Sequence, residues 1–300
     1  MNTTTPRPHI LVGIDGSASA LHALTWAGAE AKRRNLPLRL VHIVDYASFG
    51  YGFNLGAAAS FYNHLDSDGA AFLTQAKDHA YALHPNVEVS IKQVTGRPVP
   101  ILIEFSKEAL LTVVGSSGLG RFTGMLAGSV SVSLTAKADS PVVVVRESGI
   151  QAAGPIVVGV SESASSEDAI AWAFEEASMR GAELTAVHVW NEVPPGYVYA
   201  YTSWSKMDWV AIEQEQAVIL AERLAGWQEK FPDVTVHRVH SRGNPADVLL
   251  RWAQHAQLIV VGSRGRGDVG GFFLGSTSHA LIHQSVCPVL IARPHAPEDK

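Results

Sequence analysis

Short apolar runs alternate along this chain with longer segments in which apolar residues recur every three or four positions. In the first half, the apolar runs lie near residues 9–15, 38–44, 87–94, 110–115 and 141–146. Runs of this kind are typical of strands that are buried on both faces of a parallel sheet. The longer period would give one apolar stripe along a helix, as in Ile170, Ala173, Phe174 and Ala177. The alternation predicts βαβ units, with helices covering a parallel sheet.

The second half of the chain repeats the first. The segment ILVGIDGSASALHALTWAGAEA, which begins at Ile10, corresponds to IVVGVSESASSEDAIAWAFEEA, which begins at Ile156. The next apolar run has the sequence LRLVHIV in the first half and LTAVHVW in the second. Such a repeat predicts two tandem domains, residues 1–150 and 151–300, joined by the small, polar stretch 147–154. We expect each domain to be of the α/β class, with a doubly wound, five-stranded parallel sheet.

Two segments interrupt the alternation at the same place in each half. Residues 46–67 and 191–206 contain many aromatic residues and glycines and show neither period. We expect irregular structure in both. Lids or interfaces and plain surface loops are equally compatible with this composition.

A glycine-rich loop follows the fourth predicted strand of each half. The loops GSSGLGRFTGMLAGS and GSRGRGDVGGFFLGS both fit the pattern G-x2-G-x9-G-S. A polyphosphate must approach backbone N–H groups closely, and the last Gly-Ser of each loop would open a helix whose N-terminus attracts anions. Because the pattern occurs twice at equivalent places, phosphate binding is favoured over the alternative of plain turns. The predicted phosphate-binding residues are Gly115, Ser116, Gly118, Gly120, Arg121, Gly128, Ser129 and Val130 in the first half, and Gly262, Ser263, Arg264, Gly265, Arg266, Gly267, Gly275, Ser276 and Thr277 in the second.

With these motifs the chain resembles the universal stress protein family in its tandem form, from about Ile10 to Arg293. The pattern G-x2-G-x9-G-[ST] is the mark of that family's ATP-binding branch. The resemblance implies an adenine nucleotide alpha hydrolase-like fold with strand order 3-2-1-4-5 in each domain. It also implies ATP as the ligand, alone or with magnesium.

The resemblance implies roles for residues outside the glycine loops as well. Asp15, at the end of the first strand, is similar to the family's acidic residue that contacts the nucleoside. Val41 and Val187 match the second-strand valine whose backbone reads the adenine edge. Gly13 and Gly159 match the position that lies close beneath the ligand.

The second half departs from the family pattern at one of these positions, because Ser161 stands where the first half has Asp15. A serine is a poorer partner for two ribose hydroxyls, so the second site would bind more weakly or through a water bridge. The second loop, however, carries Arg264 and Arg266, whereas the first has Arg121 alone, and arginine suits phosphate. The two effects oppose each other, and the sequence leaves their balance open.

A phosphoryl-transfer enzyme needs more than a phosphate cradle, because a lysine, a metal-holding hydroxyl and a group that orients the nucleophile must also be present. No G-K-[ST] follows either glycine loop and no strand ends in an SGGxDS loop, so no catalytic residue can be named. The leading hypothesis, as the resemblance implies, is a nucleotide-dependent regulator of stress or dormancy responses. One alternative is a slow ATPase or other adenine-nucleotide enzyme, and another is a structural stress protein without a nucleotide role.

Charge and hydropathy narrow the partners and the location. The net charge of -5 and the pI of about 6.2 argue against nucleic acid and anionic membranes as partners. The sequence shows neither a membrane-spanning apolar run nor a signal peptide, so the expected location is the cytoplasm.

The fifth strands, residues 142–146 and 288–292, would be apolar edges. Such edges pair in this family, so we expect the two domains to dock and a homodimer to be feasible.

The cysteine and the histidines are weaker candidates for chemistry. Cys287 is the only cysteine, which fits a reducing compartment, and its place before an apolar run predicts a small buried side chain. His279 and His283 have the spacing of zinc ligands on a helix but lack an evident third ligand, so protein side chains alone are not expected to hold a metal. His42 and His188 repeat within the second strand and are expected to pack or bond locally.

Overall fold

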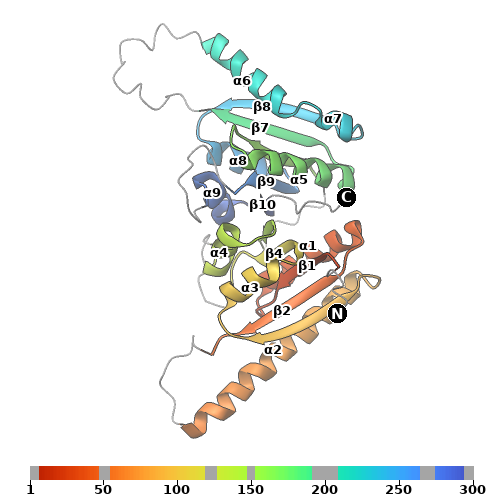
Figure 1. The fold of residues 1–300 in the computed structure, drawn as a ribbon, viewed down its shortest axis with the longest axis vertical. Coiled ribbons are helices and arrows are strands. Elements are labelled where there is room, and N and C mark those ends of the chain that lie inside the picture. The colour runs from red at the N-terminus through yellow and green to blue at the C-terminus, as the bar shows by residue number, and fades with distance from the viewer. Residues whose placement is uncertain are drawn as a thin grey trace, which may run out of the picture. The chain divides into compact units, whose positions relative to one another are not determined.

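The computed structural model describes residues 7–46, 55–118, 127–146, 153–190, 209–263 and 274–293. The chain divides into two units, within residues 1–150 and 151–293, that repeat the same order of elements except for one additional short helix, α7, in the second (Figure 1). Unit 1 contains β1 (His9–Gly13), α1 (Ala18–Arg34), β2 (Leu38–Val44), α2 (Leu55–Leu83), β3 (Val89–Thr95), α3 (Pro98–Ser106), β4 (Ala109–Gly115), α4 (Ser129–Lys137) and β5 (Val142–Val145). Unit 2 contains β6 (Ile156–Val160), α5 (Ser165–Arg180), β7 (Leu184–Trp190), α6 (Trp209–Arg223), α7 (Trp227–Lys230), β8 (Val236–Arg242), α8 (Pro245–Ala253), β9 (Leu258–Gly262), α9 (Ser276–Gln284) and β10 (Val289–Ala292).

The strands of each unit pair in parallel, in the order β3-β2-β1-β4-β5 in unit 1 and β8-β7-β6-β9-β10 in unit 2. This confirms the predicted α/β class and the strand order 3-2-1-4-5. In unit 1, α1 and α2 pack together and on the strands, while α3 packs with α4. In unit 2, α5 and α6 pack on the strands, and α8 packs with α9. The order reverses between β1 and β4 and between β6 and β9, which is where doubly wound sheets bind ligands.

The edge strands differ from the prediction of strands buried on both faces. The central strands β1 and β4 consist largely of buried residues, as predicted. In β3, however, most residues are exposed or half-buried, and Ile91 is 43% exposed. β8 shows the same pattern, with polar side chains along its length. An edge strand has a neighbour on one side alone and is less completely covered by helices, so apolar residues there are not all buried.

Residues 55–67, the later part of the predicted irregular segment 46–67, are helical instead. Helix α2 begins at Leu55 and continues for 29 residues to Leu83. Several alanines lie in this stretch, and alanine has the highest intrinsic helix propensity. Residues 47–54 and the other predicted irregular segment, 191–206, lie outside the described residues.

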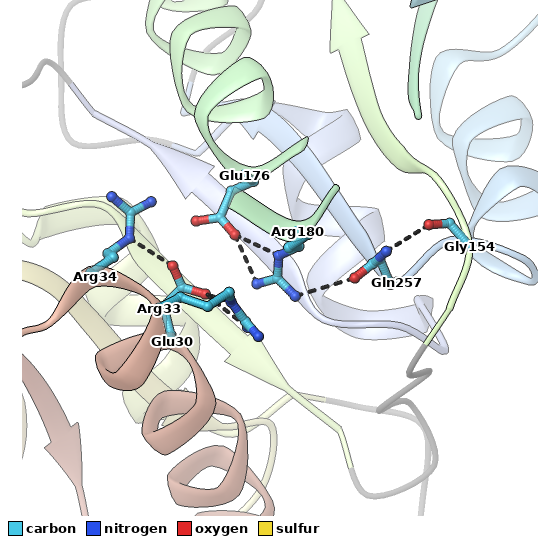
Figure 2. A network of polar contacts seen from close by, with 7 residues as sticks. All are labelled: Glu30, Arg33, Arg34, Gly154, Glu176, Arg180 and Gln257. Atoms are coloured by element: carbon cyan, nitrogen blue, oxygen red, sulfur yellow. Dashed lines mark hydrogen bonds and ion pairs between the residues drawn. The ribbon is translucent and has the colours of Figure 1, made fainter. Parts of the chain in front are cut away.

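Each unit buries a glutamate–arginine cluster at the end of its first helix (Figure 2). In unit 1, Glu30 is fully buried and accepts hydrogen bonds from Arg34 Nε at 2.6 Å and from Arg33 Nη2 at 3.0 Å. In unit 2, Glu176 is also fully buried and accepts from Arg180 Nε at 2.8 Å. A buried carboxylate is tolerated only when it is paired and hydrogen-bonded. In both clusters the arginines supply the opposite charge and the hydrogen bonds that the buried glutamate needs.

The cysteine is a packing residue, as predicted. Cys287 is fully buried just before β10, and its burial raises the pKa of the thiol to about 11. A thiol with this pKa is almost wholly protonated at neutral pH, and the thiolate is the reactive form. Cys287 therefore takes no part in the chemistry considered below.

Candidate functional site

The turn that follows β1 is organised by the carboxylate of Asp15. Its Oδ1 accepts hydrogen bonds from the Ser17 backbone N–H at 3.0 Å and from Ser17 Oγ at 2.6 Å. Ser17 Oγ in turn accepts from the Ala20 N–H at 3.1 Å, which caps the N-terminus of α1. One carboxylate oxygen of Asp15 therefore holds the turn, and the other is available for a different contact.

That second oxygen lies beside the glycine-rich loop. A Cβ atom placed on Gly118 would be 2.7 Å from Asp15 Oδ2. The loop after β4 thus reaches the turn after β1, because these two strands are neighbours in the sheet. The structure brings together two predicted site residues, Asp15 and Gly118, that are far apart in the sequence.

The two ends of the first glycine-rich loop are joined by hydrogen bonds. The Gly128 N–H donates to the Ser116 carbonyl at 2.6 Å, and Ser131 Oγ donates to the Gly115 carbonyl at 2.9 Å. Gly128 is the N-cap residue of α4 and supplies no side-chain cap. The first N–H groups of a helix have no partner within the helix, so those of Ser129 and Val130 are available to an anion.

Unit 2 has the same arrangement. The Gly275 N–H donates to the Ser263 carbonyl at 3.1 Å, and Ser278 Oγ donates to the Gly262 carbonyl at 2.8 Å. Gly275 is the N-cap residue of α9, again without a side-chain cap, so Ser276 and Thr277 occupy the positions of Ser129 and Val130. Six predicted loop residues lie outside the described residues: Gly120, Arg121, Arg264, Gly265, Arg266 and Gly267.

The backbone of the predicted adenine-reading valines is used within the sheet. The Val41 carbonyl accepts the Ile14 N–H at 2.9 Å, and Val187 lies opposite Gly159 in the equivalent register. The register of β1 with β2 ends at Gly13 opposite Val41. Alternate residues of a strand direct their backbone groups to the same side.

Two further residues, which the sequence reasoning did not name, are therefore candidates to meet a ligand through their backbone. Ile43 and Val189, each two positions after the predicted valine, direct their backbone groups to the same side as that valine, and their carbonyls lie beyond the paired register, which ends at Gly13 in unit 1 and at Val160 in unit 2. The signal that could have identified them is the strand register, which the sequence of a single strand does not reveal.

The repeated histidines tie the second strand to the turn after the first strand. His42 Nδ1 lies 2.7 Å from the Ile14 carbonyl, and His188 Nδ1 lies 3.0 Å from the Val160 carbonyl. A carbonyl oxygen can only accept, so Nδ1 carries the proton in both histidines. The predicted local bonding of these histidines is confirmed, and its consequence is to hold the residue that precedes Asp15 or Ser161.

Gly13 and Gly159 contact side chains of the neighbouring strand and helix. A Cβ on Gly13 would be 3.4 Å from Val114 and 3.8 Å from Leu102. A Cβ on Gly159 would be 3.0 Å from Leu249. Packing between the strand and its neighbours is therefore a sufficient reason for a glycine at both positions. The predicted place of these two glycines beneath a ligand stays a prediction.

Gly115 has a stricter packing requirement than Gly13. A Cβ on Gly115 would lie 2.7 Å from the backbone carbon of Ser19, in the first turn of α1. We expect Gly115→Ala to lower the free energy of unfolding by about 1–3 kcal/mol, because the helix backbone would have to move. Gly13→Ala is the matched control, since its nearest neighbour at 3.4 Å is a side chain in ordinary contact. Urea unfolding measures both, and equal losses would show that the close approach at Gly115 is unimportant.

Other features of the described residues do not add to this site. A cavity of about 410 Å3 lies at the opposite, amino-terminal edge of unit 1, between Asn35 and Val87, and includes none of the predicted site residues. The rings of His279 and His283 are 4.4 Å apart, yet within the described ranges no three metal-ligating side chains come together. None of the helices in those ranges combines the length and the apolar character needed to cross a bilayer.

Comparison with known proteins relates the whole chain to one family. The Universal stress protein family matches residues 6–146 and again residues 153–293. Universal stress protein Rv1996 of Mycobacterium tuberculosis is 37% identical over 300 residues, which cover 95% of this chain and 94% of that protein. Universal stress protein Rv2623 of the same species is 39% identical over 295 residues, with 95% and 96% covered. A solved universal stress protein from Archaeoglobus fulgidus shares the fold with a TM-score of 0.67 at 22% identity, covering 95% of this chain and 98% of its own.

Proposed function

This chain belongs to the universal stress protein family, and from that premise we propose that each unit binds ATP where its strand order reverses. One observation carries the proposal for unit 1. The carboxylate of Asp15, the backbone at Gly118 and the uncapped N-terminus of α4 all belong to loops at the carboxyl ends of the adjacent strands β1 and β4. A nucleotide needs an acceptor for its sugar and donors for its phosphates, and these groups supply both.

Each part of the nucleotide has a partner in this proposal. The phosphates would lie on the N-terminus of α4 or α9, and the arginines of the glycine-rich loops are proposed to pair with them: Arg121 in unit 1, and Arg264 and Arg266 in unit 2. The ribose hydroxyls of a nucleotide in unit 1 donate to Asp15. The adenine edge meets the backbone beyond the end of the first strand. Magnesium, when present, would neutralise phosphate charge, and its ligands would come mainly from the nucleotide and water.

ATP is proposed to regulate rather than to be consumed. A ligand changes a conformational equilibrium only through different affinities for the two states. In unit 1, the turn that carries Asp15 contacts the long helix α2, because a Cβ on Gly16 would be 2.7 Å from the Phe72 ring. A nucleotide that orders this turn therefore also acts on α2, a surface that a partner protein can recognise.

The nucleotide content of the freshly purified chain tests this function. Protein denatured after purification is expected to release ATP, which chromatography of the supernatant identifies and quantifies. Multiple-turnover phosphate release with magnesium would instead favour the slow ATPase. Absence of bound nucleotide, together with no heat of binding on titration with ATP, would favour a structural protein and overturn the proposal.

The cellular setting is part of the same proposal. The single buried cysteine is compatible with a reducing compartment, so we place the protein in the cytoplasm. The apolar fifth strands support pairing between sheets, including pairing in a homodimer. Light scattering of the full chain with and without ATP measures the assembly directly.

A further inference from the structure

The turn after the first strand differs chemically between the two units. In unit 1, Asp15 has two carboxylate oxygens, of which Oδ1 holds Ser17 and Oδ2 lies beside Gly118. In unit 2, Ser161 has a single side-chain oxygen, and this lies 2.8 Å from Ser163 Oγ and 3.4 Å from the Ser163 N–H. The oxygen of Ser161 thus performs the task of Oδ1. Ser161 itself has no second side-chain oxygen that could take the place of Oδ2.

We propose, building on the ATP-binding function above, that Asp15 and Ser161 give the two units different sugar specificities. Unit 1 selects a ribose whose two hydroxyls are both free. Unit 2 accepts adenine nucleotides whose sugar lacks these hydroxyls or carries an additional phosphate. The chain therefore presents one site of narrow specificity and one of broad specificity.

The preference of unit 1 for a ribose with free hydroxyls follows from the chemistry of the Asp15 acceptor. Asp15 Oδ2 is a charged acceptor in a half-buried carboxylate, and hydrogen bonds to charged groups are among the stronger ones. Removing the donor from the ligand leaves that acceptor without the bond while the ligand excludes water from it. The Ser161 hydroxyl already bonds within the turn, so a ligand without sugar hydroxyls loses little in unit 2.

The tolerance of unit 2 for a phosphate on the sugar follows from the charges near its turn. A phosphate on the sugar would lie within a few ångströms of the Asp15 carboxylate and be repelled by it, whereas Ser161 carries no charge. In unit 2, Arg223 of α6 donates to the carbonyl of Glu162 at 2.7 Å and so brings a guanidinium to the turn. The carboxylate of Glu162 belongs to an exposed side chain, where solvent and salt screen its charge. In unit 1 the long helix contributes the uncharged Phe72 ring at the equivalent place.

Titration calorimetry with ATP and 2′,3′-dideoxy-ATP tests the proposal in the full chain. Gly265→Glu leaves unit 1 as the binding site, and Gly118→Glu leaves unit 2. In the first background, dideoxy-ATP is expected to bind about tenfold or more weakly than ATP, and in the second within about threefold of ATP. The pair AMP and adenosine 2′,5′-bisphosphate should show the same contrast, with the bisphosphate disfavoured in unit 1 alone.

Exchanging the two residues provides the matched controls. Asp15→Ser in unit 1 should reduce the ATP preference to within about threefold, and Ser161→Asp in unit 2 should create a preference of about tenfold. Asp15→Asn keeps an oxygen for the Ser17 N–H but lacks the charged acceptor, so it should lose the preference while keeping the wild-type melting temperature. The ratio of two affinities is insensitive to any inactive fraction of a variant.

The outcomes separate this proposal from the function on which it rests. Equal sugar preferences in the two units, or preferences that the exchanges leave unchanged, overturn the specificity difference while leaving ATP binding intact. ATP binding in unit 1 alone overturns the broad specificity assigned to unit 2. Failure of ATP to bind either unit overturns both the proposed function and the inference.

Discussion

Replacing Gly118 with glutamate is expected to weaken ATP binding to unit 1 by about 100-fold or more, because two effects act in the same direction. The new Cβ would lie 2.7 Å from Asp15 Oδ2, so the loop and the carboxylate would have to separate. The added carboxylate would also repel the phosphates, and like charges about 5 Å apart at an effective dielectric constant of about 20 cost about 3 kcal/mol. Titration calorimetry in the Gly265→Glu background measures the change at unit 1 alone.

Two further variants divide this effect into its causes. Gly118→Gln has the same size as the glutamate variant without its charge, so it should show the steric part of the loss. Gly128→Ala adds a methyl group whose nearest neighbour would be 3.6 Å away, and it should retain affinity within a few-fold.

The combined Gly118→Glu and Gly265→Glu variant should carry no nucleotide after purification. Full nucleotide content in a folded double variant would contradict the placement of the phosphates.

Replacing Glu176 with glutamine is expected to lower the free energy of unfolding by about 3–5 kcal/mol. Glu176 is fully buried, and its ion-pair partner Arg180 has a side chain that is 8% exposed (Figure 2). The variant would leave the Arg180 guanidinium buried without the carboxylate that compensates its charge in α5. Glu30→Gln should have a comparable effect in unit 1, where the side chain of Arg34 is 9% exposed.

An exposed pair of similar geometry is the control for this prediction. Glu104 and Lys107 are 2.6 Å apart at i and i+3, but their side chains are 72% and 53% exposed. Water solvates both charges after either is removed, so Glu104→Gln should leave the unfolding midpoint in urea nearly unchanged. Urea unfolding followed by tryptophan fluorescence measures the midpoint of all three variants, Glu176→Gln, Glu30→Gln and Glu104→Gln. A Glu176→Gln midpoint indistinguishable from that of Glu104→Gln would show that burial does not govern the strength of this pair.

Several features of the fold could be predicted because they depend on neighbours along the chain. Apolar runs located the five strands from β1 to β5 closely and predicted helices in the intervals between them, but the beginning of α2 was missed. The repeat located their counterparts in the second half. The helical segment that begins at Leu55 was not predicted because aromatic residues and glycines interrupt the apolar period there, although the alanines among them favour a helix.

The candidate site could be predicted only in part. The glycine-rich loops and Asp15 were recognisable as sequence motifs, and the structure brings Gly118 to Asp15. The role of Val41 in reading the adenine edge stays a prediction, and the structure shows that the Val41 carbonyl accepts the Ile14 N–H within the sheet. Strand register decides which backbone groups the sheet uses, and register is a relation between strands rather than a property of one.

By itself, then, the sequence determined the α/β class, the duplication and the loops that offer backbone N–H groups, because each follows from local periodicity or from residues without side chains. The tertiary structure alone decided which Asp15 oxygen holds the turn and which faces Gly118, and that the single hydroxyl of Ser161 bonds to Ser163 within its turn. The physical reason is that each oxygen has a small number of hydrogen-bonding sites, so the bonds it makes within the fold reduce what it can offer a ligand, and three-dimensional contacts determine which sites are used.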